Sequence, residues 1–202
     1  MTKLVLKTVL ITVSAIILAL AVVYLCFAVF SPKTLAKGWE AVGSYNLSLK
    51  YYEKQYGKTE DISDLSIVCV KADAEKDAAR AVKYLKLLTE NAKFSELCDF
   101  EDTDTASADY GFTAYEIYFG KYAISAFYNA DITAAISVAK TATQNGYSKH
   151  NAFYVILSGV KTLTASDGQA IAAAVSEIKS GLTDGEQIGF ADRDIARANG
   201  IV

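Results

Sequence analysis

The sequence predicts an all-α protein, with one N-terminal transmembrane helix followed by a stack of about four antiparallel helical hairpins. Three observations support this prediction. Residues 8–30 contain no charged residue. Beyond them, apolar residues recur every three or four positions, and no stretch sustains the alternation typical of a strand. Helix-start signals recur at intervals of 34 to 36 residues, a period typical of helical repeats.

Residues 8–30 form the predicted membrane-spanning helix, preceded by a short basic flank, residues 1–7. Fourteen of the 23 residues in the segment are Leu, Ile, Val or Phe. A helix of that length reaches about 34 Å, enough to cross a hydrocarbon core of about 30 Å. The membrane lipid bilayer is therefore the expected partner of residues 8–30.

Cleavage of this segment as a signal peptide is the main alternative. Ala19-Leu20-Ala21 has the small-x-small pattern of a cleavage site. Cleavage there would leave residues 22–30 as an exposed apolar stub. A lipoprotein anchor at Cys26 is disfavoured because Leu25 is bulky where that motif has a small residue. We therefore expect an uncleaved single-pass signal-anchor.

The charges on either side of the segment give a slight preference for its orientation. Lys3 and Lys7 lie before it with the amino terminus, whereas Lys33 and Lys37 lie after it. The positive-inside rule then favours a cytoplasmic N-terminus. The expected location is the cell membrane, with an extracytoplasmic C-terminal domain.

Residues 31–202 form the expected soluble domain, and this domain is acidic. It holds 18 of the 20 basic residues and all 23 acidic residues, which gives a net charge of −5. Nucleic-acid affinity comes mainly from Lys and Arg at the phosphate backbone. Nucleic acid is therefore excluded as an expected partner.

Capping signals divide this domain into helices. Ser31-Pro32 places a capping residue before a proline at the first helical position, so a helix is expected to start there. The other expected N-caps are Asp77, Asp131, Ser148 and Ser166, and the expected C-caps are Gly57, Asn145-Gly146 and Gly181.

The spacing of these signals predicts the repeats. Gly43 and Asp77 begin two second helices 34 residues apart, and Asp131 and Ser166 begin two more 35 residues apart. An excess of about 20 residues separates the two pairs and forms an acidic insertion near residues 91–110. The insertion lacks the glycine and glutamate of a calcium loop. Four hairpins and this insertion account for the chain.

The stretch from Gly43 to Lys54, GSYNLSLKYYEK, resembles the second half of a tetratricopeptide (TPR) unit. Gly43, Tyr45, Ser48 and Tyr52 match the family's glycine, aromatic and small-residue positions. Reading Trp39 to Gly43 as the start of a first helix would shift this register. The resemblance implies a TPR-like solenoid, a scaffold whose concave surface mediates protein–protein interaction.

Tyrosines are the best candidates for such a surface. The domain contains 12, and the spacing of Tyr115, Tyr118 and Tyr122 places these three on one helix face. Together with Tyr128 they form a possible partner-binding groove, because Tyr offers contact area at low entropic cost. The competing interpretation is that each packs between hairpins with its hydroxyl at the rim.

No catalytic, cofactor-binding or metal-binding residue is predicted. The chain has one histidine, and its three cysteines form neither a C-x-x-C pair nor a disulfide framework. Cys69 and Cys98 are expected to be small buried hydrophobes, and a disulfide between them stays open.

We therefore expect no enzyme. The expected function is that of a membrane-anchored helical-repeat adaptor or assembly factor, which binds other proteins or peptide segments at the membrane surface. The alternative is a structural subunit of a membrane protein complex in which the transmembrane helix makes the main contacts, through small residues such as Ser14, Ala15 and Ala19.

Overall fold

The computed structural model describes residues 2–98 and 111–202, which form helices and no strand. The chain divides into two compact units, Met1–Val68 and Cys69–Val202. The first contains α1 (Thr2–Phe30), α2 (Pro32–Ala41), α3 (Tyr45–Thr59) and the start of α4 (Ile62–Ala74). The second contains the end of α4, then α5 (Ala78–Thr89), α6 (Phe94–Cys98), α7 (Ala114–Asn129), α8 (Ile132–Ala142), the 3-10 turn η1 (Thr143–Asn145), α9 (Ala152–Gly159), α10 (Ala165–Lys179) and α11 (Gly185–Asn199).

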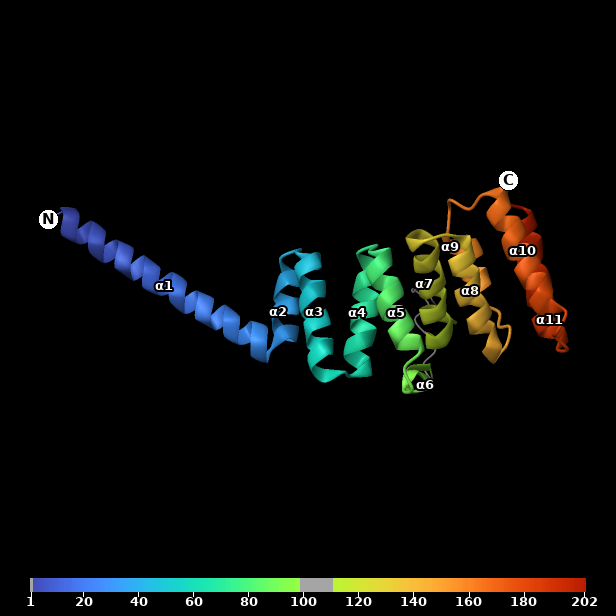
Figure 1. Cartoon of the computed structure of the whole chain (residues 1–202), viewed down its shortest axis with the longest axis horizontal. Coiled ribbons are helices and arrows are strands. Elements are labelled where there is room, and N and C mark those ends of the chain that lie inside the picture. Colours follow the sequence, from blue (N-terminus) through green and yellow to red (C-terminus); the bar gives the residue numbers. More distant parts are fainter. Residues whose placement is uncertain (1, 99–110) are drawn as a thin grey trace. The chain divides into compact units, whose positions relative to one another are not determined.

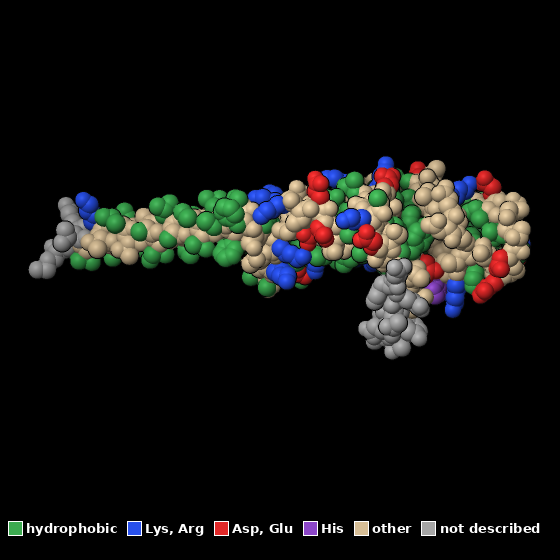
Figure 2. All heavy atoms as spheres, turned by 90° about the horizontal axis from the view of Figure 1, so that it is seen from below, with side chains coloured by type: hydrophobic (Ala, Val, Ile, Leu, Met, Phe, Trp, Pro, Cys, Tyr) green, Lys and Arg blue, Asp and Glu red, His purple; other side chains and the backbone are tan. Residues whose placement is uncertain are grey.

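Helix α1 contains the apolar segment. Val5–Phe30 is long and apolar enough to cross a membrane, and none of its most hydrophobic stretch is buried within the protein. Figure 2 shows hydrophobic side chains along this helix. Among its described side chains, Ala28 is the buried one. The structure therefore confirms one N-terminal helix with the length and composition of a membrane span.

Helices α2 and α3 pack against each other through a short turn (Figure 1). The start of α2 at Pro32 is as predicted. Gly43 in the turn has a φ of 75°, a left-handed conformation that glycine adopts without the steric cost of a Cβ. Ala36 from α2 and Leu49 and Tyr52 from α3 are buried.

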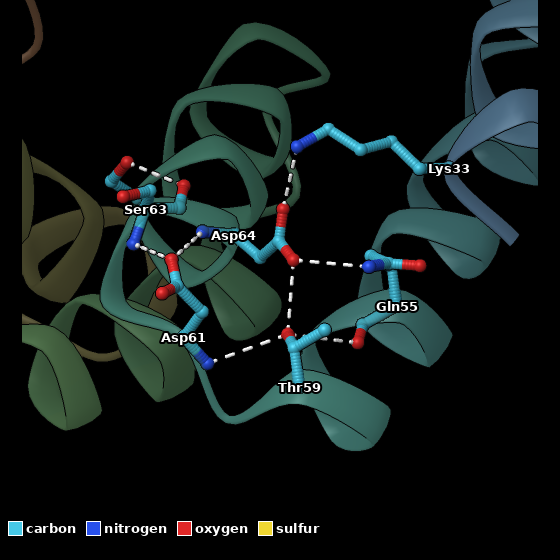
Figure 3. A network of polar contacts seen from close by, with 7 residues as sticks. Lys33, Gln55, Thr59, Asp61, Ser63 and Asp64 are labelled. Carbon is cyan, nitrogen blue, oxygen red and sulfur yellow. Dashed lines mark hydrogen bonds and ion pairs between the residues drawn. The ribbon is translucent and has the colours of Figure 1, made fainter. Parts of the chain in front are cut away.

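The carboxylate of Asp64 joins the first turn of α4 to α2 and α3 (Figure 3). The ammonium group of Lys33 donates to it at 2.7 Å, the hydroxyl of Thr59 at 2.9 Å and the amide of Gln55 at 3.2 Å. Asp61 accepts hydrogen bonds from the backbone N–H groups of Ser63 and Asp64. A buried charge is stabilised only when it is paired and hydrogen-bonded, and Asp64 is both.

This environment shifts the acidity of Asp64. Burial alone would raise the pKa of its carboxyl, but the hydrogen bonds from Lys33, Thr59 and Gln55, together with the Lys33 charge, lower it below its usual value. The carboxylate therefore stabilises the fold at neutral pH. That contribution is lost as the pH falls through the lowered pKa.

In the second unit, α7 packs against α5, α8 and α9, and α10 packs mainly against α11. A second buried carboxylate, Asp194 on α11, is fully enclosed. It accepts hydrogen bonds from the Tyr147 hydroxyl at 2.9 Å, the Asn151 amide at 3.0 Å and the Arg193 guanidinium at 2.8 Å. Burial, followed by the charge of Asp194, raises the pKa of Tyr147, so this phenol stays protonated and donates. The network fixes α11 to the start of α9.

The predicted helix starts are partly right. The side chains of Asp77 and Asp131 cap α5 and α8 as expected. Ser148 is wrong, because the Asn151 side chain accepts from two N–H groups and starts α9. Ser166 is also wrong: Thr164 starts α10, and it exchanges reciprocal hydrogen bonds with Asp167 in a capping box. Gly57 lies inside α3, and Glu60, which follows the helix, has the left-handed conformation of its C-cap.

Two other expectations differ from the described chain. Four hairpins do not account for it, because Asp184 caps a further helix, α11, which packs on α10. The acidic insertion near 91–110 begins with α6, and its residues 99–110 lie outside the described residues.

The Lys33–Asp64 pair predicts a difference between two lysines on the same helix. Lys33→Ala leaves the buried carboxylate without its charged donor, so we expect it to destabilise the first unit by about 1 kcal/mol. Lys37→Ala, one turn later at an exposed position, is the matched control and should change little. Amide hydrogen exchange across α2 and α3 in the full chain measures both; equal effects would contradict the role given to Asp64.

The same network predicts an acid dependence. The native chain should lose protection in α2 and α3 as the pH falls below about 4, the ordinary range of a carboxyl pKa. The side chain of Asp64→Asn cannot titrate. The amides of α2 and α3 should therefore be less protected from exchange in this variant than in the native chain at neutral pH, and their protection should change less as the pH falls below about 4.

Gly168 on α10 allows the backbone of α11 to approach closely. A Cβ at this position would lie 2.4 Å from the carbonyl oxygen of Ala198. Gly168→Ala should therefore destabilise the second unit by about 1–3 kcal/mol, because backbone has to move. Gly189→Ala on α11 has open space around the new methyl group and should stabilise it by about 0.5–1 kcal/mol. Thermal unfolding followed by far-UV circular dichroism would refute this account if both variants shifted the midpoint equally.

Candidate functional site

One face of α7 lines a groove in the second unit. Ile117, Lys121, Ile124 and Tyr128 follow each other at spacings of 4, 3 and 4, which places them on one side of the helix. Thr113 positions the helix start: its hydroxyl accepts from the backbone of Glu116, whose carboxylate accepts in return from the backbone and hydroxyl of Thr113. The Glu116 carboxylate is therefore engaged in capping.

The larger part of the groove lies between α7, the end of α4 and the start of α5. It has a volume of about 590 Å³, within the range of ligand-binding clefts. Most of its lining is apolar, and Tyr128 stands at its edge with 55% of its surface exposed. The lining residues are Ala72, Asp73, Lys76, Asp77, Ala78, Ala81, Ile124, Ser125 and Tyr128.

A smaller hollow of about 170 Å³ lies next to this one, toward α9. Asp73 and Ile124 line both hollows, so the two are adjacent. The other residues of the smaller hollow are Phe112, Glu116, Ile117, Lys121 and Val155. We call the two hollows together the α7 groove.

An ion pair lies where the two hollows meet. The Lys121 ammonium group donates to the Asp73 carboxylate at 2.8 Å, and both side chains are more than two-thirds buried. The pair joins α7 to the end of α4 across 48 residues of sequence. The pair places a positive and a negative charge in a mostly apolar wall, where each can bind a polar or charged group of a ligand. This chemistry suits an apolar segment that carries a few polar or charged groups.

The four predicted groove tyrosines do not gather at one surface. Tyr128 alone lines the α7 groove. Tyr115 and Tyr118 pack on the ring of Phe94, with centroids 5.9 and 6.0 Å away. Tyr122 is half-buried, and burial together with the charge of Glu90 raises its pKa. That all four contact a partner stays a prediction.

Tyr115 has a structural role. Its hydroxyl donates to the carbonyl oxygen of Ala142 at 3.0 Å and accepts from the amide of Asn145 at 3.0 Å, so it ties α7 to the end of α8. Burial raises the pKa of Tyr115, although the hydrogen bond from Asn145 opposes the shift. Tyr115 also lines a separate hollow of about 330 Å³ beside Cys98.

The cysteines are free thiols. Cys69 is buried, as expected of a small hydrophobe, and burial raises the pKa of its thiol to about 12, which disfavours the reactive thiolate. Cys98 is half-buried, and its thiol donates to the carbonyl oxygen of Phe94. Within the described ranges, no group of three His, Cys, Asp or Glu residues is placed to hold a metal ion.

Of the residues that form the α7 groove, Tyr128 was the one predicted from the sequence to contact a partner. Ile117, Ile124 and Tyr128 had the helical spacing that could have indicated a common face, but Lys121 interrupts the apolar pattern. Asp73 could not be assigned to the same site, because its partner lies 48 residues away.

Comparison with known proteins gives no relative: no family model, curated protein or solved structure matches this chain.

Proposed function

We propose that this chain is a membrane-anchored adaptor or assembly factor, in which α1 spans a membrane and the α7 groove binds a segment of another protein. The observation that carries the proposal is the groove itself: a mostly apolar hollow of about 590 Å³ with a half-exposed tyrosine at its edge. Exposed aromatic side chains beside apolar clefts are typical of protein-binding surfaces.

The proposed ligand is a segment with apolar side chains and one or two charged groups. The apolar groups would fill the larger hollow around Ile124, with Tyr128 packing over them. The charged groups would meet Asp73 and Lys121, whose pair then becomes a three-membered network. Anchoring through α1 restricts the search for a partner to the membrane plane and raises the effective concentration there.

Within this proposal the helices after α1 form a TPR-like solenoid. The packing of α2 on α3 and of α7 on α8 supports it, as does the burial of Ser48 and Tyr52, two of the residues that match the TPR pattern. The chain is proposed to be a single-pass protein of the cell membrane, with α1 as a signal-anchor, a cytoplasmic N-terminus and an extracytoplasmic C-terminal domain.

A photo-crosslinking amino acid at position 128 tests the groove in native membranes. We expect a discrete protein adduct from position 128 and none from position 87, where the native Leu87 is likewise exposed but lies outside the groove. Ile124→Glu places a charge in the larger hollow and should reduce the adduct about tenfold or more, the effect of losing about 1.4 kcal/mol or more of binding energy.

Gly168→Ala, which should destabilise the second unit and lies outside the groove, controls for a loss of folding and should leave the adduct unchanged. An adduct that persists in the Ile124→Glu variant, or that forms equally from position 87, would show that the groove is not the binding surface.

A second candidate function is that of a structural subunit, for which α1 makes the main contacts. The observation in its favour is that α1 exposes apolar side chains on all sides, among them Ile16 and Leu20. Replacing α1 with an unrelated transmembrane helix separates the two candidates. An adaptor keeps its adduct at position 128 after the exchange, whereas a subunit held by α1 loses its partner.

A further inference from the structure

The turn between α2 and α3 exposes apolar side chains without any charge. From Ala41 to Leu49, nine consecutive residues carry no charged group. Within this stretch Val42 is 71% exposed, Tyr45 50% and Leu47 38%. Large apolar side chains clustered at a surface mark contact with another protein or with a membrane. We call residues 41–49 the turn edge.

Contacts between α1 and α3 place the turn edge on the side of the apolar helix. The Lys58 ammonium group, near the end of α3, donates to the carbonyl oxygen of Phe30 at 3.2 Å. Seven residues earlier in α3, the hydroxyl of Tyr51 is hydrogen-bonded to that of Tyr24, and the two rings meet edge to face at 6.4 Å. Tyr51 therefore lies beside an earlier part of α1 than Lys58 does.

Tyr45 and the turn edge lie six residues before Tyr51 in α3, farther in the same direction. Tyr24 lies about 9 Å before Phe30 along α1, at 1.5 Å per residue. The turn edge thus points toward the apolar segment and away from its C-terminal end. In Figure 1 the α2–α3 turn lies above the α1–α2 junction, and α1 also rises from that junction toward its N-terminus.

The depth of this edge matches the membrane interface. Val5–Phe30 is about 39 Å long at 1.5 Å per residue, so a hydrocarbon core of about 30 Å that begins near Val5 ends near Tyr24. The headgroup layer beyond the core is about 5–7 Å thick, half the difference between the full bilayer and its core, and it surrounds α1 between Tyr24 and Phe30. A turn that reaches back beside this part of α1 meets the layer. Tyr and Trp favour that depth, and Tyr24, Tyr45, Tyr51 and Trp39 all belong to this unit.

The flanking charges suit the same environment. Lys37 precedes the turn edge and Lys50 follows it, and both are exposed. Long lysine side chains beside a membrane-inserted segment extend toward lipid phosphates. The one acidic residue between them, Glu40, accepts a hydrogen bond from the Tyr52 hydroxyl at 3.2 Å. Figure 2 shows basic side chains on the surface where α1 meets the remainder of its unit.

We propose that the turn edge is a second membrane contact: Val42, Tyr45 and Leu47 enter the headgroup layer of the bilayer that α1 crosses. The inference rests on the proposed anchoring by α1. It assigns a phospholipid surface as the partner, because the edge is continuous with the lipid around α1 and carries lysines at both of its ends. The first unit is then fixed to the membrane at two points.

Tryptophan fluorescence in brominated lipid tests this contact. Trp39 is the chain's one tryptophan, so Trp39→Phe gives a silent background. Into it we place Leu47→Trp, with Leu87→Trp as a control of similar native exposure, 38% against 43%. Leu18→Trp, in the middle of α1, reports on anchoring. The full chain is reconstituted in vesicles of equal parts phosphatidylcholine and phosphatidylglycerol, with or without bromine near the glycerol end of the acyl chains. For Leu18→Trp the bromine is placed near the methyl end of the chains, at the depth of the middle of the bilayer.

We expect bromine to reduce the emission of Leu47→Trp about twofold, since interfacial side chains lie about 5–10 Å into the headgroup and acyl boundary. The emission of Leu87→Trp should stay nearly unchanged. Quenching of Leu18→Trp without quenching of Leu47→Trp overturns the second contact and leaves the anchor intact. Absence of quenching at Leu18→Trp removes the anchor and this contact with it. Equal quenching at positions 47 and 87 also contradicts the proposal.

Discussion

The apolar surface of α1 is the constraint on which the other features depend. Val5–Phe30 buries almost none of this surface within the protein, and water does not favour an exposed helix of this composition. A bilayer is the solvent that matches it, because a helix satisfies its own backbone hydrogen bonds there. Under the proposed anchoring, the chain that follows folds beside a membrane. That setting would account for the aromatic side chains, lysines and uncharged turn of the first unit.

Two buried carboxylates then give each unit a defined arrangement. Asp64 joins α4 to α2 and α3, the two helices that follow α1. Asp194 joins α11 to the start of α9. Each accepts three hydrogen bonds from side chains, one of them from a cation. A buried carboxylate tolerates few alternative arrangements, because losing a donor leaves a charge unsatisfied. The α7 groove uses the same type of contact in a more exposed setting, where Asp73 and Lys121 remain accessible to a partner.

Features set by neighbouring residues were predictable from the sequence. The apolar helix, the helix start at Pro32 and the caps at Asp77 and Asp131 all depend on residues within one or two turns. The errors arose where two local signals competed. Thr164 with Asp167 forms a reciprocal capping box that Ser166 cannot form, and Asn151 accepts from two N–H groups three residues beyond Ser148.

The site depended on contacts distant in sequence and was not predictable in this way. Asp73 and Lys121 become neighbours only when α4 and α7 pack, and the Tyr24–Tyr51 contact requires α3 to lie beside α1. The tyrosine spacing correctly placed Tyr115, Tyr118 and Tyr122 on one helix. It did not reveal that Phe94 from α6 would cover the first two.

The central claim is that α1 crosses a bilayer and leaves the remaining helices on one side of it. Labelling with a membrane-impermeant maleimide in sealed vesicles tests this directly. The three native cysteines are replaced, and single cysteines are introduced by Thr2→Cys, before the apolar segment, or by Lys161→Cys, at an exposed position in the second unit. The account predicts that one of the two positions is labelled in intact vesicles and that both are labelled after detergent is added. Labelling of both positions in intact vesicles would contradict it.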